Sequence, residues 1–205
     1  KDNLGGFDPY SASKACSEII TKSFKKSFFE KSQVAIATAR IGNVIGGGDW
    51  AKDRLVPDFF RSFDKNTKLI IRNPNSIRPW QHVLEPISGL LTLAEKMVKF
   101  KNKYSGPWNF GPNENEAKSV SWVINYLSNK TKFKKFEIKK KNKFHEAHLL
   151  RIDSSKSRSL LNWTSKWDIE NSLKNTIEWY SGYKNKNEIE KITKQQIALH
   201  MKKRV

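Results

Sequence analysis

The most constraining stretch of the sequence is a short apolar run that leads straight into a glycine-rich loop. Residues 33–40 are nearly continuous in small and β-branched side chains, which is typical of a buried strand of a parallel sheet. Residues 41–50, Ile-Gly-Asn-Val-Ile-Gly-Gly-Gly-Asp-Trp, follow at once. In open α/β sheets ligands lie beyond the carboxyl ends of strands, where glycines let the backbone approach them. A long tight turn is the plain alternative, but three glycines cost chain entropy, so we favour a ligand-binding loop. The loop lacks the Gly-Lys-Ser/Thr ending of a P-loop.

Helical and extended patterns alternate along the rest of the chain. Apolar residues at helical spacing predict helices, and short β-branched or alternating runs predict strands. A chain of 205 residues is long enough for one domain, or one and a fraction. We therefore expect an α/β fold. The predicted helices cover residues 8–30, 55–64, 85–100, 120–127, 154–161 and 169–180, the predicted strands cover 33–40, 68–72, 107–111, 132–141 and 149–153, and a charged tail with helical spacing follows from residue 184.

The charge of the chain raises a second class of function. Lys and Arg number 39 against 20 Asp and Glu, a net charge of +19, which would attract nucleic acid or another polyanion. No DNA- or RNA-binding signature accompanies this charge, and the Lys residues are scattered except at 130–143 and 201–204. We therefore interpret the charge as a solvated surface, which also suits a substrate that carries a diphosphate.

Cysteine and histidine usage gives little support for metal or disulfide chemistry. Cys16 is the single cysteine, and we expect its thiol to be buried on the apolar side of the first helix. One cysteine fits a reducing compartment such as the cytoplasm. His145-Glu146-Ala147-His148 invites a zinc interpretation, but its spacing is not His-Glu-x-x-His and no third ligand is evident, so no metal is predicted. The sequence also shows no run of 18 apolar residues and no signal-peptide pattern, so no membrane insertion is predicted.

A Tyr-x-x-x-Lys motif lies at the start of the first predicted helix. Asp8 is a suitable N-cap and Pro9 a suitable first helical residue, so Tyr10 and Lys14 fall on one helix face, one turn apart. An ammonium group near a phenol favours the phenolate, which can take a proton from a sugar hydroxyl. A helix start with an incidental lysine is the alternative, because so short a motif often matches by chance.

Two arginines and a histidine stand near an aromatic residue in the middle of the chain. Arg72 and Arg78 are suited to bidentate phosphate contacts or to stacking on a base, although surface ion pairs are the commoner role of arginine. His82 precedes a predicted helix and could equally be a structural histidine.

Together, these stretches resemble the extended short-chain dehydrogenase/reductase superfamily and, within it, the CDP-glucose 4,6-dehydratases. The resemblance covers essentially the whole chain. It implies the C-terminal part of a Rossmann-type doubly wound parallel sheet in residues 1–50, a smaller α/β substrate-binding domain mainly in 51–183, and a basic tail in 184–205. The segments that carry it are Asp-Pro-Tyr-Ser-Ala-Ser-Lys at 8–14 and residues 39–50, 53–58, 71–74, 77–86, 108–112, 145–149 and 193–197.

The resemblance implies a lyase that uses NAD and CDP-glucose in deoxysugar biosynthesis. Tyr10 would deprotonate the glucose 4-hydroxyl while a hydride leaves C4 for bound NAD, water would be lost across C5 and C6, and the hydride would return to C6. The product would be CDP-4-keto-6-deoxyglucose. Lys14 would support Tyr10 and bind the nicotinamide ribose, with Arg40 also on the cofactor side. The substrate residues implied are Asn43, Arg54, Leu55, Val56, Arg72, Arg78, His82 and Glu146.

Some features of this family are absent from the sequence. The Gly-x-x-Gly-x-x-Gly turn and the acid/base residues of the dehydration step do not occur in it, so we expect roughly 130–150 residues of a dinucleotide-binding half to precede Lys1. We expect this piece alone to be inactive, and its exposed sheet edges could make it fold poorly. A homo-oligomer is expected of the full-length enzyme. Asn162 and Ser165 stand where the family usually has Gly and Pro, which puts a turn in doubt. A related nucleotide-sugar epimerase or dehydratase remains the alternative.

Overall fold

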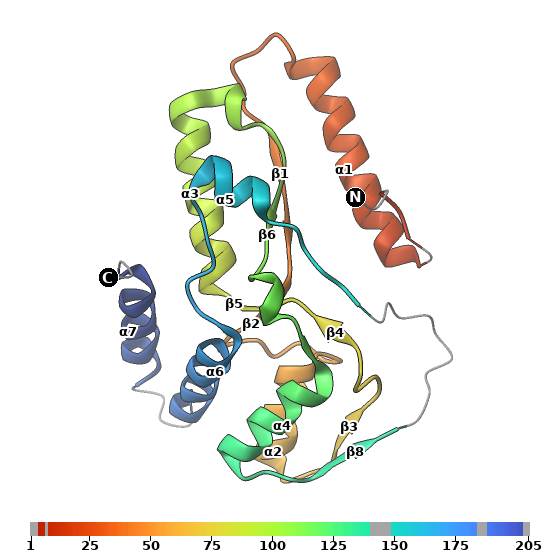
Figure 1. Cartoon of the computed structure of the whole chain (residues 1–205), viewed down its shortest axis with the longest axis vertical. Helices are drawn as coiled ribbons and strands as arrows, with labels where there is room; N and C mark the ends of the chain where they lie inside the picture. Colours follow the sequence, from red (N-terminus) through yellow and green to blue (C-terminus); the bar gives the residue numbers. More distant parts are fainter. Residues whose placement is uncertain (1–3, 7, 140–148, 184–187, 203–205) are drawn as a thin grey trace.

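The structure is a computed structural model that describes residues 4–6, 8–139, 149–183 and 188–202. Helices and short strands alternate along it, as the sequence patterns predicted (Figure 1). The α-helices are α1 (Pro9–Phe24), α2 (Leu55–Lys65), α3 (Leu84–Phe100), α4 (Val120–Thr131), α5 (Ser155–Leu161), α6 (Ile169–Tyr183) and α7 (Ile189–Met201). The strands are β1 (Ala37–Ile41), β2 (Asn43–Ile45), β3 (Leu69–Ile71), β4 (Ile77–Arg78), β5 (Trp80–His82), β6 (Gly106–Phe110), β7 (Lys118–Ser119) and β8 (Phe136–Ile138).

The strand pairing is mainly parallel. β1 pairs with β6, β2 with β5 and β3 with β8, each in parallel, whereas β4 and β7 are antiparallel. β1 and β2 are separated only by Gly42, so one extended run carries the chain from Ala37 to Ile45, and the glycine-rich loop predicted at 41–50 begins only at Gly46. Parallel pairing requires long crossover connections, which the helices supply. The predicted α/β class is therefore confirmed.

Two apolar clusters form the core. The larger one joins α2, α4 and α6 around fully buried Phe59, Ile124 and Leu173. The smaller one packs Trp108 and Phe110 of β6 against Leu161 and Trp163. In Figure 1, α2, α4, α6, β3 and β8 lie in the lower half of the molecule, and α1, α3, α5, β1 and β6 in the upper half.

The helix α1 begins as predicted but packs less than predicted. Asp8 is the N-cap and accepts a hydrogen bond from the Ser11 amide, and Pro9 is the first helical residue. The helix continues into a π-helical turn, Lys25–Phe29. Within α1, which is described throughout, Ala15 alone is buried. The predicted burial of Cys16 is wrong, because the apolar face of α1 is exposed and the thiol with it.

Two of the predicted strands are corrected. Of the predicted strand 132–141, whose last two residues lie outside the described ones, residues 136–138 form β8, and Phe133 is instead buried against Phe59 of α2. Residues 149–153 do not form a strand; Leu149 makes a single parallel bridge to Ile77, beside a hydrogen bond from the Leu150 amide to the Ile77 carbonyl. A strand needs a partner along its length, and β4 offers one for only two residues.

The C-terminal third of the chain is held by loop and cap contacts. Asn162 ends α5 in the left-handed conformation (φ 55°), a geometry that Asn tolerates better than most residues, so the turn forms without glycine. Ser154 sits at the predicted cap position, but its hydroxyl accepts a hydrogen bond from the Gly111 amide at 2.8 Å instead of capping α5. Among the described residues of the tail, Ile189–Met201 form α7, which packs on α6. Among the described helices, none has the length and apolar character needed to cross a membrane.

Candidate active site

An open cleft of about 790 Å³ lies between α1, the β1–β2 run and α2. Residues that follow the carboxyl ends of two parallel strands line it, Gly46 and Asp49 after β2 and Arg72 after β3. This is the edge of a parallel sheet at which ligands are expected. The cleft gathers seven of the predicted site residues, namely Tyr10, Asn43, Arg54, Leu55, Val56, Arg72 and Arg78.

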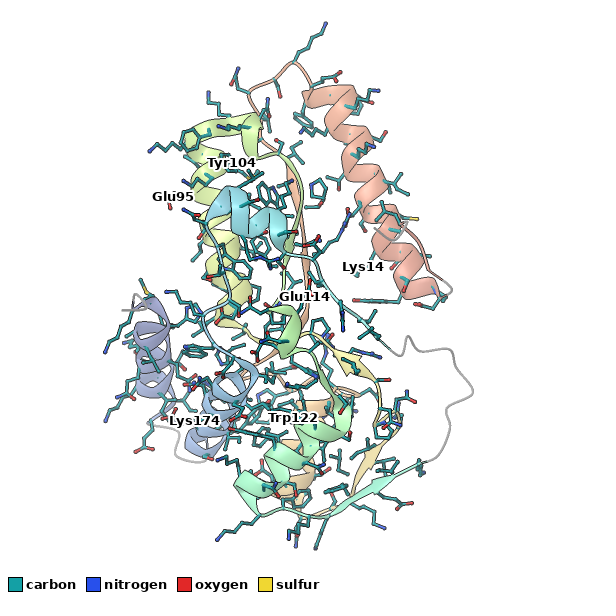
Figure 2. The ribbon with its side chains drawn as sticks, in the orientation of Figure 1. Lys14, Glu95, Tyr104, Glu114, Trp122 and Lys174 are labelled. Carbon is teal, nitrogen blue, oxygen red and sulfur yellow. The ribbon has the colours of Figure 1, made fainter. Side chains whose placement is uncertain are left out.

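Tyr10 reaches the cleft from the first turn of α1. Its side chain is 72% exposed, so the phenol is free to meet a ligand. Lys14 follows one turn later, with its ammonium nitrogen 5.5 Å from the centroid of the Tyr10 ring. Glu18, one further turn along, pairs with Arg40 of β1, so this face of α1 is turned toward the strands. Figure 2 shows Lys14 on that side of the helix.

Three arginines border the cleft from three separate segments. Arg54 precedes the first residue of α2. Arg72 follows β3 and donates to Asp53 at 2.8 Å, with both side chains mostly exposed. Arg78 is 5% exposed, donates to the Ile77 carbonyl at 2.9 Å and has further interactions. The cleft therefore combines two accessible guanidinium groups with one that is held in place by the protein.

The N-terminus of α2 forms part of the same wall. Leu55 and Val56 are its first two residues and line the cleft. The first amide groups of a helix have no partner within the helix, and together with its dipole they favour an anion. Asn43, the first residue of β2, also lines the cleft, on the β1–β2 run.

The structure does not bring all predicted residues to the cleft. Arg40 donates hydrogen bonds from Nε and Nη2 to the two carboxylate oxygens of Glu18. These bonds raise the pKa of Arg40 above its ordinary value. Arg40 thus ties β1 to α1, and neither it nor Lys14 is among the lining residues. Glu146 lies outside the described residues, so the structure gives it no place.

His82 lies behind the cleft wall. Its side chain is 2% exposed and contacts the Trp167 ring, with centroids 4.8 Å apart. Its Nδ1 accepts a hydrogen bond from the Leu84 amide at 3.3 Å, whereas its Nε2 has no hydrogen-bond partner within the part of the chain that the structure describes. Burial lowers the pKa of His82 to about 4, so the ring is neutral at physiological pH. This burial favours the structural role for His82 that the sequence left open beside a role in substrate binding.

Sequence reasoning missed the acidic residues of the cleft. Asp49 and Asp53 both line it, and Asp53 adopts a left-handed conformation (φ 61°) while its carboxylate holds Arg72. No pattern in the sequence indicated this pairing, because the two residues are brought together by α2 and β3. Among the described residues, no group of three or more His, Cys, Asp or Glu side chains is placed to hold a metal ion.

The geometry suits proton transfer beside a bound anion. The Tyr10 phenol, which has the Lys14 ammonium near its ring, lines the cleft together with three arginines and the first residues of α2. A Tyr-x-x-x-Lys helix beside parallel strands agrees with the resemblance to the extended short-chain dehydrogenases/reductases that the sequence carries.

Comparison with known proteins specifies the family. The family model described as "GDP-mannose 4,6 dehydratase" matches residues 2–176, and the chain belongs to this family. A curated relative, the CDP-glucose 4,6-dehydratase of Salmonella typhimurium (strain LT2), is 41% identical over 204 aligned residues, which cover 97% of this chain and 57% of the relative.

Solved structures share the fold. The dTDP-glucose 4,6-dehydratase of Bacillus anthracis in complex with NAD superposes with a TM-score of 0.72 at 21% identity, over 91% of this chain and 55% of that one. The UDP-glucose-4-epimerase of Stenotrophomonas maltophila with bound NAD and formylated UDP-arabinopyranose gives 0.75 at 16% identity, over 88% and 57%. The chain thus spans a little over half the length of the relatives that it matches.

Proposed function

We propose that this chain is the part of a CDP-glucose 4,6-dehydratase that carries the catalytic tyrosine and most of the substrate site. The observation that carries the proposal is the shared cleft. Tyr10, Asn43 and the three arginines come from distant segments of the sequence, and all of them line one cavity. The 41% identity to the Salmonella enzyme supports CDP-glucose as the substrate.

NAD is the proposed cofactor. A bound NAD would supply a reversible hydride acceptor for the sugar. The donor set beside the cleft fits the nicotinamide ribose, because the Tyr10 phenol and the Lys14 ammonium lie on one helix face. Both groups can donate hydrogen bonds to ribose hydroxyls. The relatives solved with NAD support this assignment.

In the proposed reaction each of these residues has a separate role. Tyr10 takes the proton of the glucose 4-hydroxyl, and Lys14 supports the phenolate by its positive charge. Arg54, Arg72 and the N-terminus of α2 hold the diphosphate, to which they offer hydrogen-bond donors and positive charge. Asn43 orients the sugar. Arg78 is held by the protein before the substrate arrives, so it adds a guanidinium that needs little ordering.

The proposal is tested on the full-length protein that contains this chain. CDP-glucose carrying deuterium at C4 is incubated with the protein and NAD, and the product is analysed by mass spectrometry and NMR. We expect loss of one water and the appearance of deuterium at C6. Turnover of dTDP-glucose or GDP-mannose but not of CDP-glucose would refute the substrate, and C4 epimerisation without water loss would identify an epimerase.

A matched pair of tyrosine variants tests the mechanism. Tyr10→Phe removes the proton acceptor, and we expect it to lower kcat by at least about 100-fold. Tyr104→Phe is the control, because Tyr104 stacks on Trp108 in the smaller core cluster. Retained activity in Tyr10→Phe would contradict the assigned role.

Two further properties of the full-length enzyme are proposed. It assembles as a homo-oligomer, which the exposed apolar side chains of α1 and of the π-helical turn after it support, since contiguous apolar surface marks protein contacts; these side chains are Ile19, Ile20 and Phe24 of α1 and Phe28 of the turn. It works in the cytoplasm, where the exposed thiol of Cys16 would stay reduced. Light scattering tests the oligomeric state, and cell fractionation tests the location in the cytoplasm.

A nucleic-acid-binding role stays the weaker alternative, and salt-sensitive binding of generic DNA would support it.

A further inference from the structure

The glycine-rich loop is pressed against α6. A Cβ atom added to Gly47 would lie only 1.9 Å from the Trp179 ring, so a residue with a side chain cannot occupy this position without a shift. Gly48, in a left-handed conformation (φ 80°), has the same ring 3.6 Å from its Cβ position. The loop that lines the cleft through Gly46 and Asp49 therefore rests directly on one indole.

The C-terminal helix holds this indole from its other side. Trp179 Nε1 donates a hydrogen bond to Thr193 Oγ1 of α7 at 3.0 Å. An indole has one hydrogen-bond donor, so this bond fixes how the ring is turned against the loop. Ile192 of α7 packs on Gly182 of α6, where an added Cβ would meet its Cδ1 at 2.1 Å. The two helices therefore approach closely just beyond Trp179.

A neighbouring residue of α6 holds the far end of the loop. The Tyr180 hydroxyl donates to the Asp49 carbonyl at 2.5 Å, and the Tyr180 ring stacks on Phe60 of α2 with centroids 3.9 Å apart. The Trp50 ring packs edge-on against Tyr180. Adjacent residues of one helix thus contact the loop at its glycines and at its end.

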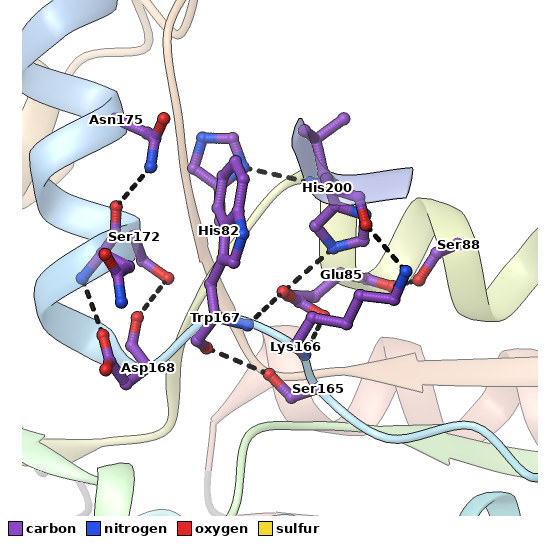
Figure 3. Close-up of polar contacts among 12 residues, drawn as sticks. His82, Glu85, Ser88, Ser165, Lys166, Trp167, Asp168, Ser172, Asn175 and His200 are labelled. Atoms are coloured by element: carbon purple, nitrogen blue, oxygen red, sulfur yellow. Dashed lines mark hydrogen bonds and ion pairs between the residues drawn. The ribbon is translucent and has the colours of Figure 1, made fainter. Parts of the chain in front are cut away.

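α7 is itself anchored by buried polar contacts. Gln196 Nε2 donates to the Asn175 carbonyl of α6 at 2.9 Å. His200 Nε2 lies 3.0 Å from Glu85 Oε1, and Lys166 Nζ donates to the His200 carbonyl at 2.7 Å (Figure 3). Gln196, His200 and Glu85 are all buried. The hydrogen bonds of Gln196 and Lys166 hold α7 in place, because buried polar groups are costly to leave unpaired, whereas His200 Nε2 lies close to Glu85 without a hydrogen bond among the described residues.

We propose that α7 is a positioning element of the cleft: through Thr193 and Trp179 it holds the glycine-rich loop in the place where the loop meets the substrate. That the loop meets the sugar diphosphate rests on the proposed function, whereas the coupling of α7 to the loop rests on the contacts alone. Trp179 and Thr193 do not line the cleft. Their effect on a ligand is therefore indirect.

One peptide bond reports on the loop. Gly48-Asp49 is the single Gly-Asp pair of this sequence, so the full-length protein that contains it, labelled with ¹³C-carbonyl glycine and ¹⁵N-aspartate, gives a selective NMR signal for this pair, which is assigned by its loss in Asp49→Asn. The signal lies beside the Trp179 ring, whose ring current shifts it. Thr193→Val keeps the shape of the side chain and removes the hydrogen-bond acceptor. We expect Thr193→Val to move or broaden the Asp49 signal beyond its linewidth, and Trp179→Phe to move it further.

The control for these variants lies on the same helix. Lys194→Ala removes an exposed ion pair with Glu190 and is expected to leave the Asp49 signal in place. Melting temperatures of all three variants show that the fold is kept. An Asp49 signal that does not respond to Thr193→Val would overturn the proposal, whatever the protein is found to catalyse.

The kinetic consequence is measured on the full-length protein. We expect Thr193→Val to raise KM for CDP-glucose roughly threefold to tenfold and to leave kcat within a factor of about two, because the loop contributes to binding before the chemical step. A shifted signal with an unchanged KM would overturn the role of the loop in substrate binding. If the protein turns over no nucleotide sugar, the proposed function fails, and the Asp49 signal alone decides whether α7 positions the loop.

Discussion

Glu85 and His200 meet in the interior of the protein, with Oε1 of the carboxylate 3.0 Å from Nε2 of the imidazole. Glu85 is fully buried in the first turn of α3, and His200 is 4% exposed near the end of α7. The same carboxylate accepts hydrogen bonds from the amides of Lys166 and Trp167 at 2.9 and 2.8 Å. One buried side chain thus joins α3, the segment before α6 and the C-terminal helix (Figure 3).

The stability of the fold depends on this carboxylate. Glu85→Ala leaves two buried amide donors without an acceptor and His200 without its neighbour, so we expect the free energy of unfolding to fall by about 3–5 kcal/mol. Urea unfolding followed by circular dichroism measures the change. Glu95→Ala, on the exposed side of the same helix, is the control and is expected to stay within about 0.5 kcal/mol. Equal losses in the two variants would refute a special role of Glu85.

His82 makes stability depend on pH. Its folded-state pKa of about 4 lies below the ordinary value of 6.5, so the unfolded state binds more protons between these values and stability falls as pH decreases from 7 to 4. With 1.36 kcal/mol per pKa unit, the loss is about 3 kcal/mol. Glu85, His200 and Trp167 surround the ring.

His82→Asn isolates this contribution. Asparagine keeps an acceptor for the Leu84 amide but does not titrate. The variant should be less stable at pH 7 because a buried ring is lost, and its stability should fall less steeply between pH 7 and pH 4 than that of the wild type. Parallel pH profiles of the two unfolding free energies would show that His82 does not titrate in this range.

The sequence predicted features that are set by neighbouring residues better than features that depend on contacts between distant segments. Asp8 and Pro9 define the start of α1 because a cap acts within one turn. The predicted strand at 149–153 failed because its partner β4 is short, a fact that no local pattern contains. The glycine-rich loop and Arg72 were recognised as candidate site residues, but their supports, Trp179 and Asp53, come from distant segments. His82 remained open between two roles because burial cannot be deduced from its neighbours in the sequence.

The attachment of α1 to the sheet depends on Arg40. Its two donors bind both oxygens of Glu18, while most of α1 is exposed. Arg40→Leu is expected to destabilise the docking of α1 by about 1 kcal/mol, a limited effect because Arg40 is partly exposed. Amide exchange in residues 9–24 should then accelerate roughly fivefold.

A charge swap provides the control for this prediction. Glu18→Arg combined with Arg40→Glu restores a pair of opposite charges, and it should recover much of the lost protection. Exchange in β8, remote from α1 in Figure 1, should be the same in all variants. If Arg40→Leu and the wild type exchange alike over α1, other contacts hold the helix.

Under the proposed function, the pair of Asp53 and Arg72 predicts a variant that binds CDP more tightly. Both residues line the cleft, and their ion pair of 2.8 Å is exposed, at 70% and 59%, so it contributes at most about 1 kcal/mol. A diphosphate that binds Arg72 must displace Asp53, and the Asp53 carboxylate also repels it. Asp53→Asn removes this competition, and asparagine tolerates the left-handed backbone at this position as aspartate does.

We therefore expect Asp53→Asn to lower the Kd for CDP about threefold to fivefold, and Arg72→Ala to raise it. Calorimetric titrations of the full-length protein at two salt concentrations measure both effects, and the gain should shrink at high salt because the competing charges are exposed. Weaker binding by Asp53→Asn would mean that Asp53 holds Arg72 in the orientation that the diphosphate needs, which would reverse the role assigned to it here.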